Sequence, residues 1–147
     1  MKLSQYFDLD EFIISQAASR RGIDNTPNPK VINNLKLLCK NILDPAREAL
    51  GPLKISSGFR CTALNNAVGG SKTSAHTLGY AADIIPLKAS KMELAKWISK
   101  NVEFDQLILE FGTKDNPDWI HVSVDPKNRK QVLQILGKSG FKPINLI

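Results

Sequence analysis

Residues 118–125, DWIHVSVD, and residues 74–83, SAHTLGYAAD, decide how this chain is expected to fold. In the first stretch, apolar residues alternate with others, which is typical of a strand with one face on a core. Successive side chains of a strand point to opposite faces, so Trp119, His121 and Ser123 share one face and the apolar residues between them take the other. The pattern therefore predicts a strand whose His121 side chain points away from the core.

Outward from this strand, the spacing of apolar residues and of Gly and Pro predicts helices first and strands afterwards. Helical spacing predicts a helix over residues 8–20 and a long helix over residues 31–49, with a kink at Pro45 and an end at Gly51. Strands are expected at residues 53–58, 80–87, 105–112 and 118–125. Helices are expected within residues 61–70, closed by Gly69 and Gly70, at residues 90–101, with Ser90 and Glu93 as a capping box, and at residues 129–136, where the helix stops at Gly137 and a short extended end follows. The predicted fold class is α+β in a single domain spanning residues 1–147, with N-terminal helices on a mostly antiparallel sheet.

Charge and composition exclude several classes of protein. The chain has 147 residues and a net charge of +6, with 42% hydrophobic and 23% charged residues, which is ordinary globular usage. No apolar run approaches the roughly 18 residues that cross a bilayer, and acidic residues from Asp8 onward interrupt any signal-peptide core. We therefore expect no membrane insertion and no signal peptide. The basic balance favours an anionic partner without choosing one, and no nucleic-acid recognition motif is present.

The two cysteines do not indicate a disulfide scaffold or a metal pair. Cys39 and Cys61 are too few for the former and too far apart for a CxxC site, so we expect both to be reduced, with a single bridge between them as the alternative.

Three residues at separate positions in the sequence have side chains that could bind one cation together. His76 and Asp83 stand seven residues apart with Gly79 between them, so a turn in the loop can bring the imidazole to the strand carboxylate. His121 can supply a third ligand from its own strand. Two imidazoles and one carboxylate suit zinc, and three protein ligands leave a coordination position open, as in catalytic zinc sites. The sequence thus predicts one Zn²⁺ ion and a hydrolase.

The motifs SGFRC, LNNAVGGS, SAHTLGYAADI and WIHVSV together resemble the zinc D-alanyl-D-alanine carboxypeptidases and peptidoglycan endopeptidases, especially short single-domain members from bacteria and phages. The resemblance covers about residues 5–145. It implies that His76, Asp83 and His121 bind zinc, and that the fold is the α+β architecture shared with the hedgehog signalling domain. It further implies that Arg60 stabilises the scissile carbonyl or the substrate carboxylate, and that Ser74 contacts substrate.

The general base is the point at which the chain departs from the family pattern. Many relatives place a glutamate three residues before the last histidine, where this chain has Asp118, one methylene shorter. Glu110 is the other candidate, because alternation puts it on one face with Gln106 and Ile108. The sequence does not fix which carboxylate reaches the reacting water, so Asp118 and Glu110 both stay open.

The resemblance implies a zinc metallopeptidase that cuts peptidoglycan stem peptides or cross-links, as a D-Ala-D-Ala carboxypeptidase or an endopeptidase. A catalytically silent cell-wall binding module of the same fold is the alternative. Without a signal peptide, a phage lysin made in the cytoplasm and released by a holin, or a virion component, is expected to act at the cell wall. We expect a monomer with a peptide substrate and no nucleic-acid partner.

Overall fold

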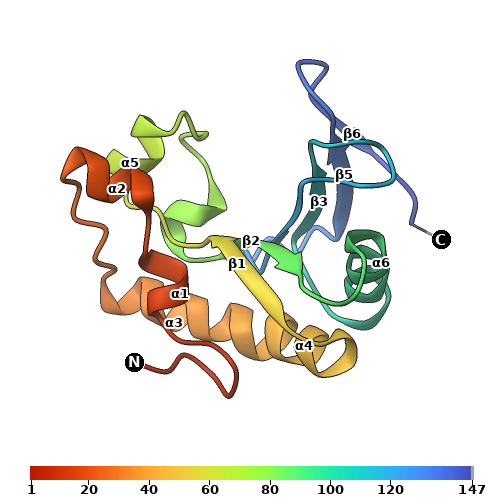
Figure 1. Ribbon diagram of the computed structural model, residues 1–147, viewed down its shortest axis with the longest axis horizontal. Helices are drawn as coiled ribbons and strands as arrows, with labels where there is room; N and C mark the ends of the chain where they lie inside the picture. Colours follow the sequence, from red (N-terminus) through yellow and green to blue (C-terminus); the bar gives the residue numbers. More distant parts are fainter. Residues whose placement is uncertain (147) are drawn as a thin grey trace.

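The computed structural model describes residues 1–146, in which four α-helices and a π-helix precede the first strand, as expected, and further helices lie between the first three strands (Figure 1). The helices are α1 (Asp10–Ile13), α2 (Gln16–Arg21), α3 (Pro29–Leu38), the π-helix η1 (Cys39–Leu43), α4 (Asp44–Leu50), α5 (Thr62–Ala67), the 3₁₀-helix η2 (Ala75–Leu78) and α6 (Lys91–Asn101). The strands are β1 (Leu53–Ser57), β2 (Ala81–Pro86), β3 (Gln106–Glu110), β4 (Trp119–Ser123), β5 (Gln131–Ile135) and β6 (Phe141–Pro143).

All six strands form one sheet in the order β1-β2-β4-β3-β5-β6. Every neighbouring pair is antiparallel except β3 and β5, which run parallel. The predicted α+β class with a mostly antiparallel sheet is confirmed.

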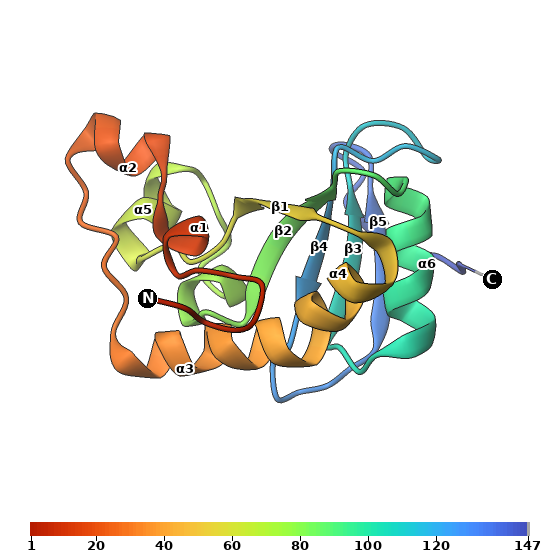
Figure 2. The same ribbon diagram turned by 60° about the horizontal axis from the view of Figure 1, so that its bottom comes forward.

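One face of the sheet packs on helices and the other carries polar groups. Ile84 of β2, Leu109 of β3 and Ile120 of β4 are fully buried in a core that includes Leu35 of α3 and Ile98 of α6. Figure 2 shows α3 and α4 in line beneath the sheet and α6 beside it. Because side chains alternate along each strand, the neighbouring residues of β2, β3 and β4 face the opposite side. That second face holds the candidate site.

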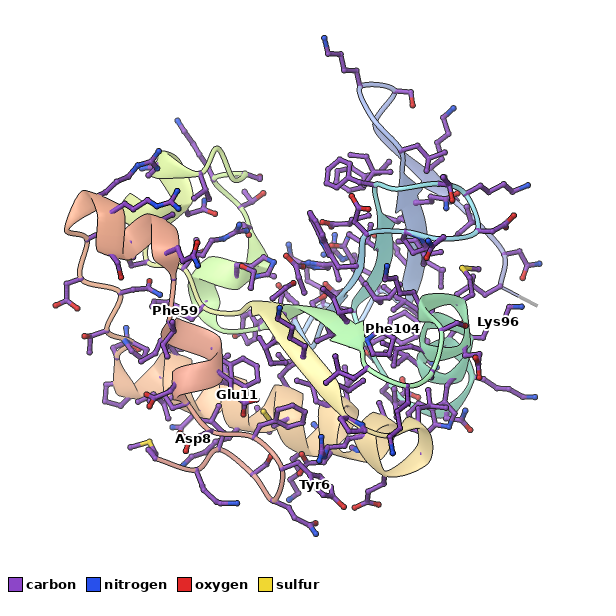
Figure 3. The ribbon with its side chains drawn as sticks, viewed as in Figure 1. Tyr6, Asp8, Glu11, Phe59, Lys96 and Phe104 are labelled. Carbon is purple, nitrogen blue, oxygen red and sulfur yellow. The ribbon has the colours of Figure 1, made fainter. Side chains whose placement is uncertain are left out.

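Aromatic residues near these elements are buried, and a charged residue on the surface of a helix is exposed. Phe59 and Phe104, labelled in Figure 3, are buried, whereas Lys96 on α6 is exposed.

The predicted capping box of α6 is present: the Ser90 hydroxyl accepts from the Glu93 backbone N–H at 3.0 Å, and the Glu93 carboxylate accepts from the Ser90 N–H at 3.1 Å.

The single helix expected over residues 8–20 is divided into α1 and α2. Ile14 is extended with ψ of 128°, and Ser15 caps α2 by accepting from the Ala18 backbone N–H at 3.2 Å. The Phe12 carbonyl accepts instead from the Phe59 N–H at 2.7 Å. A long-range backbone bond therefore replaces the continuation of the first helix.

The long helix is confirmed from Pro29 to its end at Gly51, but the expected kink is a π-helical turn. Residues Cys39–Leu43 form the π-helix directly before Pro45. Proline has no N–H to donate, so it stands in the first turn of α4, where that donor is not required.

The helix expected over residues 129–136 is wrong, because Gln131–Ile135 form strand β5, whereas the extended end expected after Gly137 is present as β6. Asn128 and Lys130 have positive φ angles of 46° and 54°, which interrupt a helix before it can begin. The Asp105 carboxylate holds Arg129 through the side-chain Nε at 2.9 Å and Nη2 at 2.7 Å. This contact places the following residues beside the edge of β3 that does not pair with β4. Strand β5 pairs with the backbone of β3 along that edge.

No helix among residues 1–146 has both the length and the apolar character needed to cross a membrane.

Candidate metal centre

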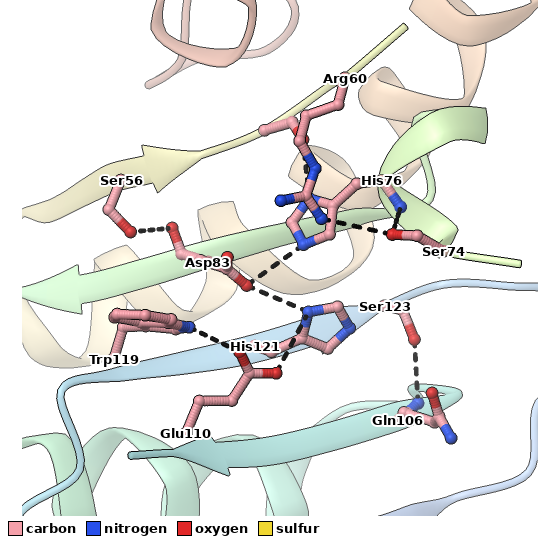
Figure 4. Close-up of polar contacts among 11 residues, drawn as sticks. Ser56, Arg60, Ser74, His76, Asp83, Gln106, Glu110, Trp119, His121 and Ser123 are labelled. Atoms are coloured by element: carbon pink, nitrogen blue, oxygen red, sulfur yellow. Dashed lines mark hydrogen bonds and ion pairs between the residues drawn. The ribbon is translucent and has the colours of Figure 1, made fainter. Parts of the chain in front are cut away.

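Three potential metal ligands meet on the polar face of the sheet (Figure 4). His76 comes from η2, Asp83 from β2 and His121 from β4, and Asp83 and His121 are directly opposed across the strand pair. Asp83 Oδ1 lies 3.3 Å from His76 Nε2 and 3.0 Å from His121 Nδ1. The three ligand atoms lie within 4.8 Å of one another, and the residues are only 3%, 6% and 7% exposed. The structure thus brings together the three residues that the sequence singled out.

The hydrogen bonds of His76 define which of its nitrogens is available to a cation. Nδ1 lies 2.7 Å from the Gly58 carbonyl oxygen, which can only accept, so Nδ1 carries the proton. In the neutral ring, Nε2 then directs a lone pair at the Asp83 carboxylate. Two lone pairs at 3.3 Å repel each other unless a positive charge lies between them. A bound cation or a proton at this point would relieve that repulsion.

The pKa shifts of Asp83 and His121 also favour a positive charge beside the Asp83 carboxylate. Burial would raise the pKa of Asp83, but the adjacent His76 and His121 hold it well below its usual range. Burial would lower the pKa of His121, but its hydrogen bond to Asp83 raises it above the ordinary value. Both shifts favour a carboxylate beside a positive charge.

The donor set fits zinc, and two of its three separations are near those around a tetrahedral ion. Ligand atoms about 2.0–2.2 Å from a tetrahedral zinc ion lie about 3.3–3.6 Å apart, close to the separations from Asp83 Oδ1. Two imidazole nitrogens and one carboxylate oxygen, with the Gly58 carbonyl fixing the orientation of His76, are a ligand set of the catalytic type. These three residues could hold one zinc ion.

Glu110 lies beside this ligand set. It pairs with Trp119 across β3 and β4, which places it diagonally next to His121. Its Oε2 lies 4.0 Å from His121 Nδ1, and its Oε1 accepts from the Trp119 indole Nε1 at 2.8 Å. Burial raises the pKa of Glu110 above its ordinary value, and the charge of Asp83 raises it further. A carboxylate with one oxygen fixed and the other near the ligands can exchange a proton there.

Asp118 has a different position. It is exposed and immediately precedes β4, and within residues 1–146 its carboxylate makes no ion pair or hydrogen bond to the three ligands. Its backbone N–H donates to the Glu110 carbonyl at 2.9 Å. The structure therefore brings Glu110, but not the Asp118 carboxylate, to the ligand set.

Arg60 and Ser74 lie on the other side of the ligands. Arg60 Nη2 donates to the Ser74 hydroxyl at 3.4 Å, and the same hydroxyl accepts from the His76 backbone N–H at 3.2 Å. Partial burial lowers the pKa of Arg60, while Asp83 and Glu110 oppose this shift. The guanidinium thus faces the two carboxylates of the site without an ion pair to either within the described part of the chain.

The sequence analysis missed Gly58 and Asn25. Gly58 supplies the carbonyl that orients His76, and a Cβ at this position would lie 2.6 Å from backbone atoms of Phe12. The signal for Gly58 was its place two residues before Arg60 in SGFRC. The three hydrogen bonds of Asn25 join it to residues distant in the sequence, so no local sequence pattern predicts them.

Both cysteines are free thiols. Cys39 is buried in the core and Cys61 is half-buried at the start of α5. Burial raises the pKa of the Cys39 thiol to about 12, which makes it unreactive at neutral pH.

Comparison with known proteins agrees with the geometry. No curated protein sequence matches the chain. The sequence model of the family described as Peptidase M15 matches residues 5–123, a range that contains the three potential ligands, Arg60 and Glu110. The motifs SGFRC, SAHTLGYAADI and WIHVSV all fall inside that match, which confirms the resemblance seen in the sequence. Since the match extends over most of its length, this chain belongs to the Peptidase M15 family.

Proposed function

We propose that this protein is a zinc-dependent peptidase that hydrolyses peptide bonds in peptidoglycan stem peptides or their cross-links. The observation that carries the proposal is the convergence of His76, Asp83 and His121 beside Glu110 and Arg60 on one face of the sheet. Membership of a peptidase family supports a peptide substrate. The cell-wall substrate rests on the motifs that resemble D-alanyl-D-alanine carboxypeptidases and endopeptidases.

The metal and the carboxylate have separate tasks in this proposal. His76, Asp83 and His121 would hold zinc, which would supply Lewis acidity toward a water molecule and the substrate carbonyl. Glu110 takes a proton from the attacking water at Oε2 and delivers it to the leaving amine nitrogen as the C–N bond breaks. Its proximity to His121 Nδ1 and its bond to Trp119 support Glu110 over Asp118 as the general base.

Arg60 binds the substrate in this scheme. Its planar guanidinium matches either a terminal carboxylate or the oxygen on which negative charge develops. Ser74 orients that guanidinium through the 3.4 Å contact and can itself donate to substrate. A cavity of about 380 Å³ is lined by Arg60, Ser56 and Ser57, but by none of the three ligands. Larger cavities of about 540 and 610 Å³ contain none of these site residues.

The experiment is product analysis by mass spectrometry after incubation of purified peptidoglycan with the protein. Zinc-loaded protein is compared with chelated protein, with His121→Ala and with Ser90→Ala, which alters only the distant cap of α6. Release of D-alanine that requires zinc and His121 indicates a carboxypeptidase, and new amino termini within stems or bridges indicate an endopeptidase. Absence of any product from protein that binds one zinc ion would refute catalysis and leave a binding module of the same fold.

A further inference from the structure

The segment Gly58–Cys61 joins the N-terminal part of the chain to the candidate metal centre. On one side, the Gly58 carbonyl accepts from His76 Nδ1 at 2.7 Å, and the Arg60 N–H donates to the His76 carbonyl at 3.2 Å. On the other side, the Phe59 N–H donates to the Phe12 carbonyl at 2.7 Å. The position of this segment therefore sets the relation between Arg60 and the ligand His76.

Asn25 binds this segment at both peptide groups that flank Arg60. Its side-chain Nδ2 donates to the Phe59 carbonyl at 3.0 Å, and its Oδ1 accepts from the Cys61 N–H at 2.8 Å. The second hydrogen of Nδ2 goes to the Ile13 carbonyl at 3.0 Å. One acceptor faces an N–H and two donors face carbonyls, so the partners fix the orientation of the amide.

These bonds constrain Arg60 directly. The Phe59 carbonyl belongs to the peptide that precedes Arg60, and the Cys61 N–H to the peptide that follows it. Holding both peptide planes fixes the φ and ψ angles of Arg60 and hence the direction in which its side chain leaves the backbone. Asn25 is only 8% exposed, so water does not compete for these bonds.

The guanidinium itself has few other restraints. Its contact with Ser74 is long, at 3.4 Å, and its buried Nε has no hydrogen-bond partner within residues 1–146. A long side chain with so few bonds of its own depends on its backbone for direction. We propose that Asn25 is a positioning residue that aims Arg60 at the substrate, an inference that rests on the proposed peptidase function.

The kinetic test is a double-mutant cycle between Asn25→Ala and Arg60→Ala on a peptidoglycan peptide, with zinc content measured for every variant. We expect Asn25→Ala to lower kcat/KM about 10- to 100-fold, the cost of a misplaced group. In the Arg60→Ala background, the same change should lower kcat/KM less than about 2-fold, because its target is gone. An equal loss in both backgrounds would overturn the proposal, since a merely structural residue acts independently of Arg60.

A second readout needs neither activity nor metal. The buried Nε–H of Arg60 should give a resolved, slowly exchanging ¹⁵N signal, assigned by its absence in Arg60→Lys. In Asn25→Ala that signal should exchange with water at least about 10-fold faster, because the side chain is released to solvent. An unchanged signal in folded Asn25→Ala would overturn the proposal. If the wild-type protein cuts no peptide, the proposed function fails, and this measurement alone decides the role of Asn25.

Two further variants separate positioning from stability. Asn25→Asp is isosteric and keeps the acceptor for Cys61, but it replaces both donors by an oxygen that the Ile13 and Phe59 carbonyls repel, so a loss in both readouts is expected even if Asn25→Ala does not fold. Ser90→Ala removes a bond at the cap of α6 and lowers stability without touching the site. Both readouts should match wild type in Ser90→Ala, and a similar loss there would overturn the assignment.

Discussion

Replacing Glu110 by Gln removes the proposed proton acceptor while disturbing little else. The Gln side chain has the same shape, and its carbonyl oxygen can still accept from Trp119 Nε1, which lies 2.8 Å from Glu110 Oε1. The negative charge 4.0 Å from His121 Nδ1 is lost. Because the buried carboxylate also repels Asp83, neutralising it should change the free energy of unfolding by no more than about 1 kcal/mol.

The kinetic effect should be much larger than the effect on stability. A positioned general base contributes about 10²- to 10⁴-fold to the rate, so Glu110→Gln should lower kcat by that factor, equivalent to about 3–5 kcal/mol of activation free energy. The assay is release of amine from a peptidoglycan peptide, with zinc content and melting temperature measured in parallel. Zinc should stay at one ion per chain, because Glu110 is not among the three ligands.

Asp118→Asn is the matched control, since it makes the same chemical change at the alternative acid. Asp118 is exposed, and within residues 1–146 its carboxylate has no contact with the ligands, so kcat should stay within about 3-fold of wild type. The reasoning would be refuted if Asp118→Asn abolished activity while Glu110→Gln retained it.

Three other perturbations test the metal site, a buried ion pair and a close backbone contact. Zinc at 100 times its Kd should stabilise the protein by about 2.7 kcal/mol, or roughly 5–10 °C in Tm, and His121→Ala should abolish this shift in a thermal melt. Asp105→Asn should cost about 2–3 kcal/mol in chemical denaturation at pH 7. Its bonds to Arg129 hold the pKa of Asp105 below its unfolded value near 3.9, so wild-type stability from this pair is present above that pH and lost below it, whereas the variant should lack this acid dependence. Gly58→Ala should destabilise by about 3 kcal/mol, because the new Cβ would lie 2.6 Å from Phe12 backbone atoms, and unchanged stability would contradict the close approach.

Strands β4 and β5 show which parts of the sheet a local sequence pattern can predict. The alternation of residues 118–125 predicted both β4 and the side of the sheet on which His121 lies. In a strand with one buried face, every second residue is apolar, so the sequence itself shows the strand period. The segment 129–136 has a short apolar run that is compatible with either a helix or a strand, so the helix predicted there had no unique support in the sequence. Its state was decided by the free edge of β3 and by the bonds between Asp105 and Arg129, which join residues 24 positions apart.

The sequence by itself determined the chemistry available to this protein. Its two histidines, a strand aspartate after the turn at Gly79 and the SGFR arginine limited the site to a nitrogen and oxygen ligand set with one cationic side chain. Tertiary structure alone decided which carboxylate accompanies them, because the register of β3 on β4 puts Glu110 diagonal to His121 and leaves Asp118 outside. It also decided that Asn25 grips the segment bearing Arg60, since hydrogen bonds across 34 and 36 residues depend on packing and leave no local signal in the sequence.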